Sequence, residues 1–401
     1  MAKKILNPDL QFDDEADEEG VAEQLEPGEI AAVVTGTDWT TETIVSQLTR
    51  GNIQLNPRFQ RRDAWKQDRK SRFIESLIVG LPIPQIVLAE AKRQRGKFIV
   101  LDGKQRLLTI LQFWGNGEGT NNEYRLSGMT LREDLDGKSF ADLSNEQSSR
   151  NDFDALCNQT IRTVVIRNWK DTDFLHTVFL RLNTGSVSLS PQELRQALLP
   201  GEFANFVDDR AAESAGLRKL LGISGPDPRM RDTEILARFI SFRFFAEGYP
   251  GRMKGFLDAT FETFNSNWAD NGPSVERAVS DFEDGVKELV NVFGDELAKK
   301  PSSRQFNRAI FDALIYFHSQ PAVRKALRSK AAEVRKAYKD LFSTDSKFLK
   351  AIESDTAGAS NTSTRLNIWA AALSKIIGNP VKAPKIPVAN RSTESTRGAS
   401  Q

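Results

Sequence analysis

The sequence has 401 residues, with 55 Lys and Arg against 54 Asp and Glu, so its formal charge is +1. One cysteine and two histidines exclude an internal disulfide framework, a cysteine-based zinc site and catalysis by a cluster of histidines. No apolar run approaches the roughly 20 residues that span a bilayer, and no apolar signal-peptide segment follows the first Met, so we expect a cytoplasmic protein without membrane contact.

The near-neutral total conceals two charged segments. Residues 1–28 contain nine acids and two lysines, a net charge of −7, whereas residues 50–106 contain fourteen Lys or Arg and five acids, a net charge of +9. We therefore predict a disordered acidic tail over residues 1–35, because this stretch offers little apolar surface for packing. A weaker hypothesis has the tail fold back over the basic segment as an electrostatic autoinhibitor, and the simpler alternative is a solubilising extension.

Residues 36–200 mix short strands with helices. Runs of apolar residues predict a hairpin from strands over 86–89 and 98–101, with a basic tip at 92–96, and a third strand over 163–166. Helical periodicity appears at 73–78, 107–114 and 174–182. Ser190 and Glu193 form a capping box with Pro191 between them, which predicts a helix from 191 onward.

Residues 201–380 read as an all-helical domain, and residues 381–401 as a flexible basic tail. Amphipathic helices are expected at 231–246, 252–265, 274–298, 304–319, 322–342 and 363–377. The fold class is therefore α+β, with a mixed N-terminal domain followed by a helical one. Cys157, His176 and His318 are all expected to be packing residues.

The densest candidate site is the run Asp102-Gly103-Lys104-Gln105-Arg106, where a strand ends and a helix begins. The N–H groups of a first helical turn bind anions, Gly103 allows a ligand close to the backbone, and Lys104 and Arg106 suit phosphate. Asp102 is suited to hold a divalent cation or to orient an arginine, and Gln105 to position a water or a base. For this run alone, a capped helix with solvated basic residues is the simpler interpretation.

A second basic motif precedes this run by about forty residues. Gln60 and Arg61 come before Trp65 and a helix that carries Lys66, Arg69 and Lys70. These cations are expected either to converge on the same anion or to contact DNA, together with Lys92, Arg93 and Arg95 of the hairpin tip. A solvated helix face anchored by Trp65 is the alternative.

Four segments in order resemble a known family. They are P-x-F-Q-R-x3-W from Pro57, V-L-D-G-K-Q-R-L-L-T from Val100, the pair F-L-R-L-N-T-G and L-S-P-Q-E-L-R within 179–195, and R-D-x-E-I-L-A-R-F from Arg231. Together they are similar to the N-terminal domain of GmrSD-type modification-dependent restriction endonucleases, which belongs to the ParB/sulfiredoxin-like superfamily, and the resemblance spans roughly 40–345.

The resemblance implies an NTP-binding, NTP-hydrolysing and DNA-engaging module of a restriction or anti-phage defence system. Its D-G-Q-Q-R motif corresponds to Asp102–Arg106, which makes Asp102, Gln105 and Arg106 the expected catalytic residues, with Mg²⁺ held through Asp102. The residues expected to bind nucleotide phosphate are Gln60, Arg61, Gly103, Lys104, Thr109 and Asn183. Lys104 departs from the family's glutamine, so turnover is less firmly implied than binding.

The resemblance also implies a partner. An HNH nuclease domain usually completes such a system, and His176 and His318, 142 residues apart, do not supply one. We therefore expect a separately encoded HNH subunit as a partner, along with DNA, modified or not, and a nucleoside triphosphate, and a homo-oligomer is compatible with this picture. Two further interpretations stay open: a non-enzymatic DNA-binding adaptor of the same family, and a helical scaffold with a degenerate domain.

Overall fold

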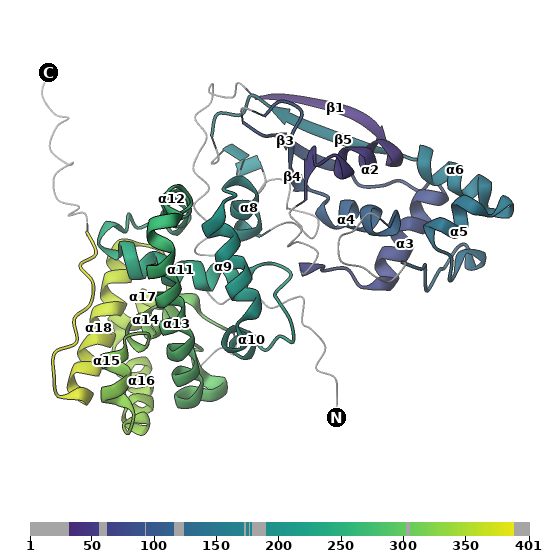
Figure 1. The fold of residues 1–401 in the computed structure, drawn as a ribbon. Coiled ribbons are helices and arrows are strands. Elements are labelled where there is room, and N and C mark those ends of the chain that lie inside the picture. The colour runs from purple at the N-terminus through teal and green to yellow at the C-terminus, as the bar shows by residue number, and fades with distance from the viewer. Residues whose placement is uncertain are drawn as a thin grey trace, which may run out of the picture. The chain divides into compact units, whose positions relative to one another are not determined.

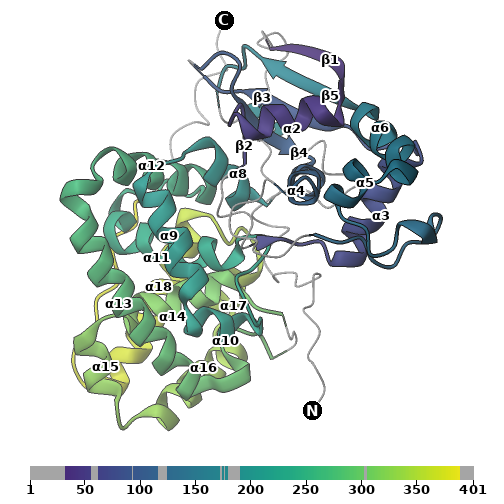
Figure 2. The same ribbon diagram turned by 45° about the vertical axis from the view of Figure 1, so that its right-hand side comes forward.

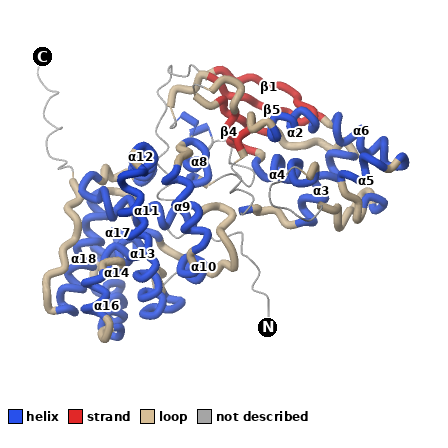
Figure 3. The backbone as a smooth tube through the Cα atoms, viewed as in Figure 1, coloured by secondary structure: helices blue, strands red, loops and turns tan. Residues whose placement is uncertain are grey.

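The computed structural model describes residues 32–55, 62–92, 94–115, 124–171, 174–175, 177–178, 190–301 and 305–388. These residues form two compact units. Of these residues, one unit contains those from 32 to Leu198 together with Pro228–Met230, and the other contains Leu199–Asp227 and those from Arg231 to 388. Among the described residues, strands are confined to the first unit, as Figure 3 shows, so the mixed N-terminal part and the helical C-terminal part agree with the fold class expected from sequence.

The N-terminal unit is built on a five-stranded mixed sheet of order β1-β5-β3-β4-β2. Its strands are β1 Val33–Thr40, β2 Ile53–Gln54, β3 Ile86–Glu90, β4 Phe98–Asp102 and β5 Thr160–Arg167. The predicted hairpin is confirmed as the antiparallel pair β3–β4, and the predicted third strand is β5. Figure 1 shows β1 beside β5 along its whole length, an antiparallel pairing that the sequence had not predicted.

Apolar residues that alternate along the strands cover the sheet on both faces. Ile86 and Leu88 of β3 lie in the core beneath the helices, whereas Val87 and Ala89 lie in a second core on the opposite face. The helices of this unit are α2 Thr41–Thr49, α3 Gln67–Ile78, α4 Lys104–Phe113, α5 Phe140–Asn145, α6 Arg150–Asn158 and α8 Pro191–Leu198. Figure 2 shows α3, α4, α5 and α6 grouped beside the sheet.

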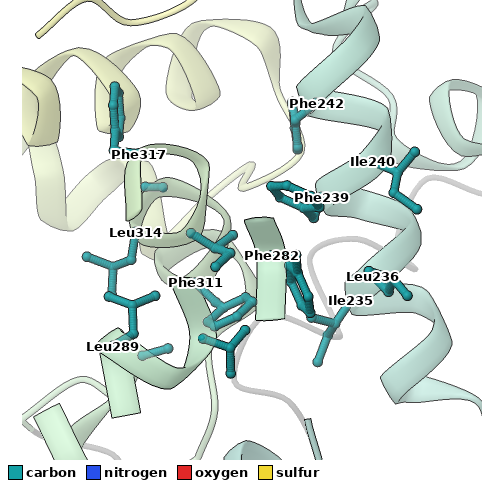
Figure 4. Packing of buried hydrophobic residues seen from close by; sticks show 14 of the residues in the cluster. Ile235, Leu236, Phe239, Ile240, Phe242, Phe282, Leu289, Phe311, Leu314 and Phe317 are labelled. Carbon is teal, nitrogen blue, oxygen red and sulfur yellow. The ribbon is translucent and has the colours of Figure 1, made fainter. Parts of the chain in front are cut away.

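The second unit consists of helices around an aromatic core. They are α9 Glu202–Glu213, α10 Ala215–Leu221, α11 Arg231–Phe245, α12 Met253–Ser266, α13 Trp268–Phe293, α14 Arg308–His318, α15 Pro321–Leu327, α16 Ala331–Thr344, α17 Ser346–Glu353 and α18 Ala359–Ile377. Phe239 of α11 packs against Phe282 of α13 with ring centroids 5.0 Å apart (Figure 4). Burial of such rings supplies most of the driving force for packing the helices.

Three details of this unit differ from expectation. The predicted helix 322–342 is two helices, α15 and α16, separated at 328–330, and α13 begins at Trp268, so that Pro273 lies inside it. In the stretch 381–388, assigned from sequence to a flexible tail, Ile386 is buried in the helical core. Residues 1–31 and 389–401 lie outside the described residues, as does the autoinhibition hypothesis for the acidic tail.

No helix in the described ranges is both long and apolar enough to cross a membrane. His318 is fully buried against Trp369, with its Nδ1 3.6 Å from Glu288 Oε1, which agrees with the expected packing role. His176 lies outside the described residues. Cys157 is half-buried, and burial raises the pKa of its thiol to about 11, so the thiol stays protonated at neutral pH.

Candidate functional site

The first turn of α4 begins at Gly103, directly after β4 ends at Asp102. Gly103 is the N-cap residue with φ +96°, a left-handed conformation that an L side chain adopts only with strain, and it has no side chain to cap the helix. The first turn of α4 contains no acidic residue. Because a helix start leaves its first N–H groups without intrahelical acceptors and carries the positive end of the helix dipole, this turn is suited to bind an anion.

Arg106 places its guanidinium back over this N-terminus. Its Nη2 donates to Asp102 Oδ2 at 2.8 Å and to the Gln85 carbonyl at 2.9 Å. A Cβ built on Gly103 would lie 3.3 Å from Nη2 and 3.4 Å from Nε of Arg106, so the guanidinium lies against the glycine. Arg106 is 8% exposed, and its buried Nε has no hydrogen-bond partner among the described residues.

The Asp102 carboxylate accepts a hydrogen bond from Arg106 and so orients an arginine, which is one of the two roles expected for it. The ladder between β3 and β4 shifts register between Val87 and Leu88, and Val87 then pairs with Asp102, so an irregularity lies beside the end of β4. Within the described ranges, no group of three or more His, Cys, Asp or Glu side chains is arranged to hold a metal ion.

Lys104 does not point its ammonium at the solvent side of the turn. Its Nζ forms an ion pair with Glu193 Oε1 of α8, and the two side chains are only 4% and 5% exposed. Glu193 Oε2 in turn accepts from the Ser190 N–H at 2.7 Å, and Ser190 Oγ accepts from the Glu193 N–H at 3.1 Å, so the predicted capping box is confirmed. The sequence assigns Lys104 to phosphate; its ammonium is paired with Glu193, 89 residues away, and the assignment stays a prediction.

The end of the earlier basic motif lies against α4. The Ala64 N–H donates to Gln105 Oε1 at 3.3 Å, and Gln112 Nε2 donates to Asp63 Oδ2 at 3.1 Å. Lys70 of α3 bonds to Asp63 and to Gln112 Oε1, the latter at 2.8 Å. The segment 62–65, which follows Gln60 and Arg61 in the chain, is thus fastened to the helix that begins at the candidate site.

Several residues expected at the site have other positions. Gln105 uses its side-chain oxygen to hold Ala64, and Thr109 is fully buried with its hydroxyl donating to the Gln105 carbonyl at 2.8 Å. These contacts favour a role of Thr109 within the helix over the predicted contact of its side chain with phosphate. Gln60, Arg61 and Asn183 lie outside the described residues.

The cations expected to contact DNA differ in their exposure to solvent. Lys66, Arg69, Lys92 and Arg95 are exposed, with Arg69 over the Trp65 ring at 4.6 Å and Lys92 over the Trp169 ring at 4.5 Å. Lys70 is buried in its ion pair with Asp63, which favours a structural role over the predicted contact with DNA. Arg93 lies outside the described residues.

Glu75 of α3 is a buried acid that the sequence had not marked. Its carboxylate accepts from the N–H groups of Thr130, Leu131 and Arg132, with Leu131 N at 2.7 Å and Arg132 N at 2.8 Å from Oε1. Burial raises the pKa of Glu75, but these backbone hydrogen bonds outweigh it and bring the pKa below the usual value of 4.5. The carboxylate anchors the 130–132 loop to α3, which is a structural role.

A second group of buried charges lies in the helical unit, on the R-D-x-E-I-L-A-R-F segment. Arg238 is fully buried and its Nη2 and Nε bond to Asp312 of α14, while Arg308 Nη1 donates to Glu234 Oε1 at 2.6 Å. Removing one partner of such a pair leaves a buried unpaired charge and typically costs about 3–5 kcal/mol. The positive and negative charges of these described residues pair with one another, so we interpret the group as an ionic framework that stabilises the helical unit.

Residues 41–200 match the family described as GmrSD restriction endonuclease, N-terminal domain. The matched range contains the α4 N-terminus and the whole of α8, but neither β1 nor Pro228–Met230 of the N-terminal unit. A comparison with curated proteins found no match.

Proposed function

We propose that this chain, whose residues 41–200 match the GmrSD restriction endonuclease N-terminal domain family, is an NTP-binding and NTP-hydrolysing, DNA-engaging subunit of a modification-dependent restriction or anti-phage defence system. The domain is mixed α/β, and the ParB/sulfiredoxin-like assignment of its fold is part of the same proposal. Cleavage of DNA is assigned to a separate HNH nuclease subunit, because the two histidines of this sequence are far apart and His318 is buried in the helical core.

The observation that carries the proposal is the cradle at the start of α4. A glycine N-cap with positive φ, a first turn without acids and a buried arginine with one donor unpaired are found together at Asp102–Arg106. Each feature favours a compact oxyanion over a neutral ligand. A phosphate bound there would accept from first-turn N–H groups and from Arg106 Nε, which combines the helix dipole with a charge-assisted hydrogen bond.

Hydrolysis would use the same groups. Charge that develops on the transferred phosphoryl oxygens is stabilised by fixed donors and cations, and in this site Arg106 is the cation already held in place by Asp102 and the Gln85 carbonyl. Gln105 would act by holding the 62–65 segment against α4. Mg²⁺, when bound with the nucleotide, would supply further neutralisation of phosphate charge, with Asp102 as its carboxylate.

The test is nucleotide binding and turnover by the purified chain. ATP and GTP are titrated into wild type, Asp102→Ala and Arg106→Ala, with Mg²⁺ and with EDTA, and phosphate release is followed. Arg162→Ala is the matched control, because Arg162 also pairs with an aspartate, Asp38, in the same unit but on the β1–β5 pair. The proposal requires both site variants to lose binding or turnover while the control keeps them, and unchanged turnover in both site variants would refute it.

A non-enzymatic DNA-binding adaptor is the second candidate function. It is favoured by the exposed cations Lys66, Arg69 and Arg95, which are set apart from the buried ion pairs of the same unit. Contact with phosphates makes log affinity fall with log salt by about 0.9 per phosphate neutralised. An affinity for duplex DNA that stays flat between low and physiological salt, in wild type, would count against this function.

A further inference from the structure

Three residues from beyond the family-matched range are part of the N-terminal unit. Pro228–Met230 belong with residues up to Leu198, although the chain on either side of them belongs to the helical unit. Met230 is completely buried and packs with Leu108 of α4 and with Leu55. Leu55 is the last described residue before the segment that contains Gln60 and Arg61.

Met230 holds a strained backbone in this position. Its φ is +56°, in the left-handed region that few residues other than glycine occupy. Such conformations persist where surrounding contacts fix them, and they are often found near functional sites. A fully buried methionine side chain with this backbone shows that the contact with α4 is maintained against a local cost.

A hydrogen-bonded chain joins the same segment to the first residue of α4. Ser190 Oγ donates to the Arg229 carbonyl at 2.6 Å, Ser190 and Glu193 form the capping box of α8, and Glu193 pairs with Lys104. Lys104 and Leu108 are four residues apart, so they lie on one face of α4. That face is therefore held at two adjacent points, by Glu193 at the first turn and by Met230 one turn later.

The other described contacts of α4 lie on faces other than the Lys104–Leu108 face. Leu107 and Ile110 lie in the core with the sheet, and Gln105 and Gln112 face the 62–65 segment. Without the 228–230 segment, the Lys104–Leu108 face would lose its apolar contact with Met230 and the Arg229 carbonyl that anchors the α8 cap. The start of α4 would then be held by the sheet side, by the 62–65 segment and by the Lys104–Glu193 ion pair, without the apolar contact on this face.

We propose that Pro228–Met230 is a positioning element of the phosphate site, with Met230 and Ser190 as its positioning residues. It fixes the start of α4 in the orientation that binds nucleotide phosphate, and so the family-matched range 41–200 does not complete the site by itself. The proposal deepens the proposed function and rests on it for the identity of the ligand.

The experiment uses the full chain with four substitutions. Met230→Ala removes the contact with α4, Met230→Leu keeps an apolar side chain of similar volume, and Ser190→Ala cuts the bond to Arg229. Met253→Ala is the control, because Met253 is another buried methionine, 6% exposed, in α12 of the helical unit. Two quantities are measured: the Kd for ATP and GTP, and amide hydrogen exchange at residues 104–107 without nucleotide.

A small displacement of a binding group is enough to reduce affinity strongly, so we expect Met230→Ala and Ser190→Ala to raise Kd on the order of tenfold. Met230→Leu is expected to restore affinity, and Met253→Ala to leave it unchanged. Equal affinity in Met230→Ala and wild type, or an equal loss in Met253→Ala, would overturn the positioning role.

The hydrogen-exchange measurement separates the two proposals. If wild type binds neither ATP nor GTP, the proposed function fails, and the positioning claim is then decided by exchange alone. Faster exchange at 104–107 in Met230→Ala, and not in Met253→Ala, supports the claim, and unchanged exchange overturns it. Ser190→Ala keeps the apolar contact between Met230 and α4, so its exchange rates test the positioning claim in the same way if Met230→Ala does not fold.

Discussion

Replacing Gly103 with alanine tests the geometry of the candidate site most sharply. With φ +96° the alanine would be strained by about 1–2 kcal/mol. Its Cβ would also lie 3.0 Å from Ile86 Cγ1 and 3.3 Å from Arg106 Nη2, and relieving such crowding in a packed region typically costs about 1–3 kcal/mol. Together these effects predict a loss of about 2–5 kcal/mol in the free energy of unfolding.

Gly115→Ala is the matched control at the other end of the same helix. Gly115 has φ +75°, and a Cβ there would meet nothing within 4 Å, so only the backbone strain applies. Urea denaturation should show a larger loss for Gly103→Ala than for Gly115→Ala, by about 1–3 kcal/mol. Nucleotide affinity, measured under conditions where both variants are folded, should fall for Gly103→Ala alone because Arg106 is displaced. Equal destabilisation with equal affinity would refute the reasoning.

Three further predictions follow from described contacts. Glu75→Gln should lower the free energy of unfolding by about 1.5–3 kcal/mol at neutral pH. Because the pKa of Glu75 in the folded protein lies below 4.5, this loss should be constant above pH 4.5 and should shrink as the pH falls through the folded pKa. A loss that does not change with pH down to 3 would contradict the assignment. With a pKa of about 11 against the usual 9.0, Cys157 should react with iodoacetamide at pH 8 roughly a hundredfold more slowly than an exposed thiol, and a free-thiol rate would show the burial to be wrong. Lys66→Ala should reduce the salt slope of DNA binding by about 0.9, whereas Lys70→Ala should lower stability without changing the slope, so equal slopes for the two variants would count against the surface assigned to DNA.

Local signals in the sequence were sufficient for much of the fold. The β3–β4 hairpin is indicated by runs of neighbouring apolar residues. The start of α8 is indicated by the Ser190–Glu193 capping box. β1 was missed because Val33–Thr40 is largely exposed and contains Gly36 and Asp38, which are poor strand formers. It is a strand because its backbone pairs with β5, about 130 residues later in the chain.

The candidate site was predicted in its backbone and only partly in its side chains. The strand–glycine–helix pattern at Asp102–Arg106 located the turn proposed to bind an anion, and the Asp102–Arg106 ion pair follows from their i,i+4 spacing. The partner of Lys104 is decided by the packing of α8 on the sheet, and no local pattern specifies which of many acids it will meet. Lys104 was therefore assigned to phosphate because its charge was visible in the sequence and Glu193's proximity was not.

The role of Met230 was beyond the reach of sequence patterns for a related reason. Met230 stands immediately before a strongly periodic helix, where a connecting residue is expected to be exposed. Its burial against Leu108 joins residues 122 positions apart and needs a left-handed backbone that methionine rarely adopts. Only the three-dimensional structure shows that the loop before α11 packs against α4.

The central claim is that the first turn of α4 binds the phosphates of a nucleoside triphosphate. Amide hydrogen exchange at residues 104–107 of the wild-type chain, with and without ATP or GTP at saturating concentration, tests it most directly. We predict slower exchange at Lys104, Gln105 and Arg106 on nucleotide binding, because their N–H groups have no intrahelical acceptor and become hydrogen-bonded to phosphate oxygens, whereas the Leu107 N–H already donates to the Gly103 carbonyl. Nucleotide binding that leaves exchange at 104–107 unchanged and protects another segment instead would contradict the claim.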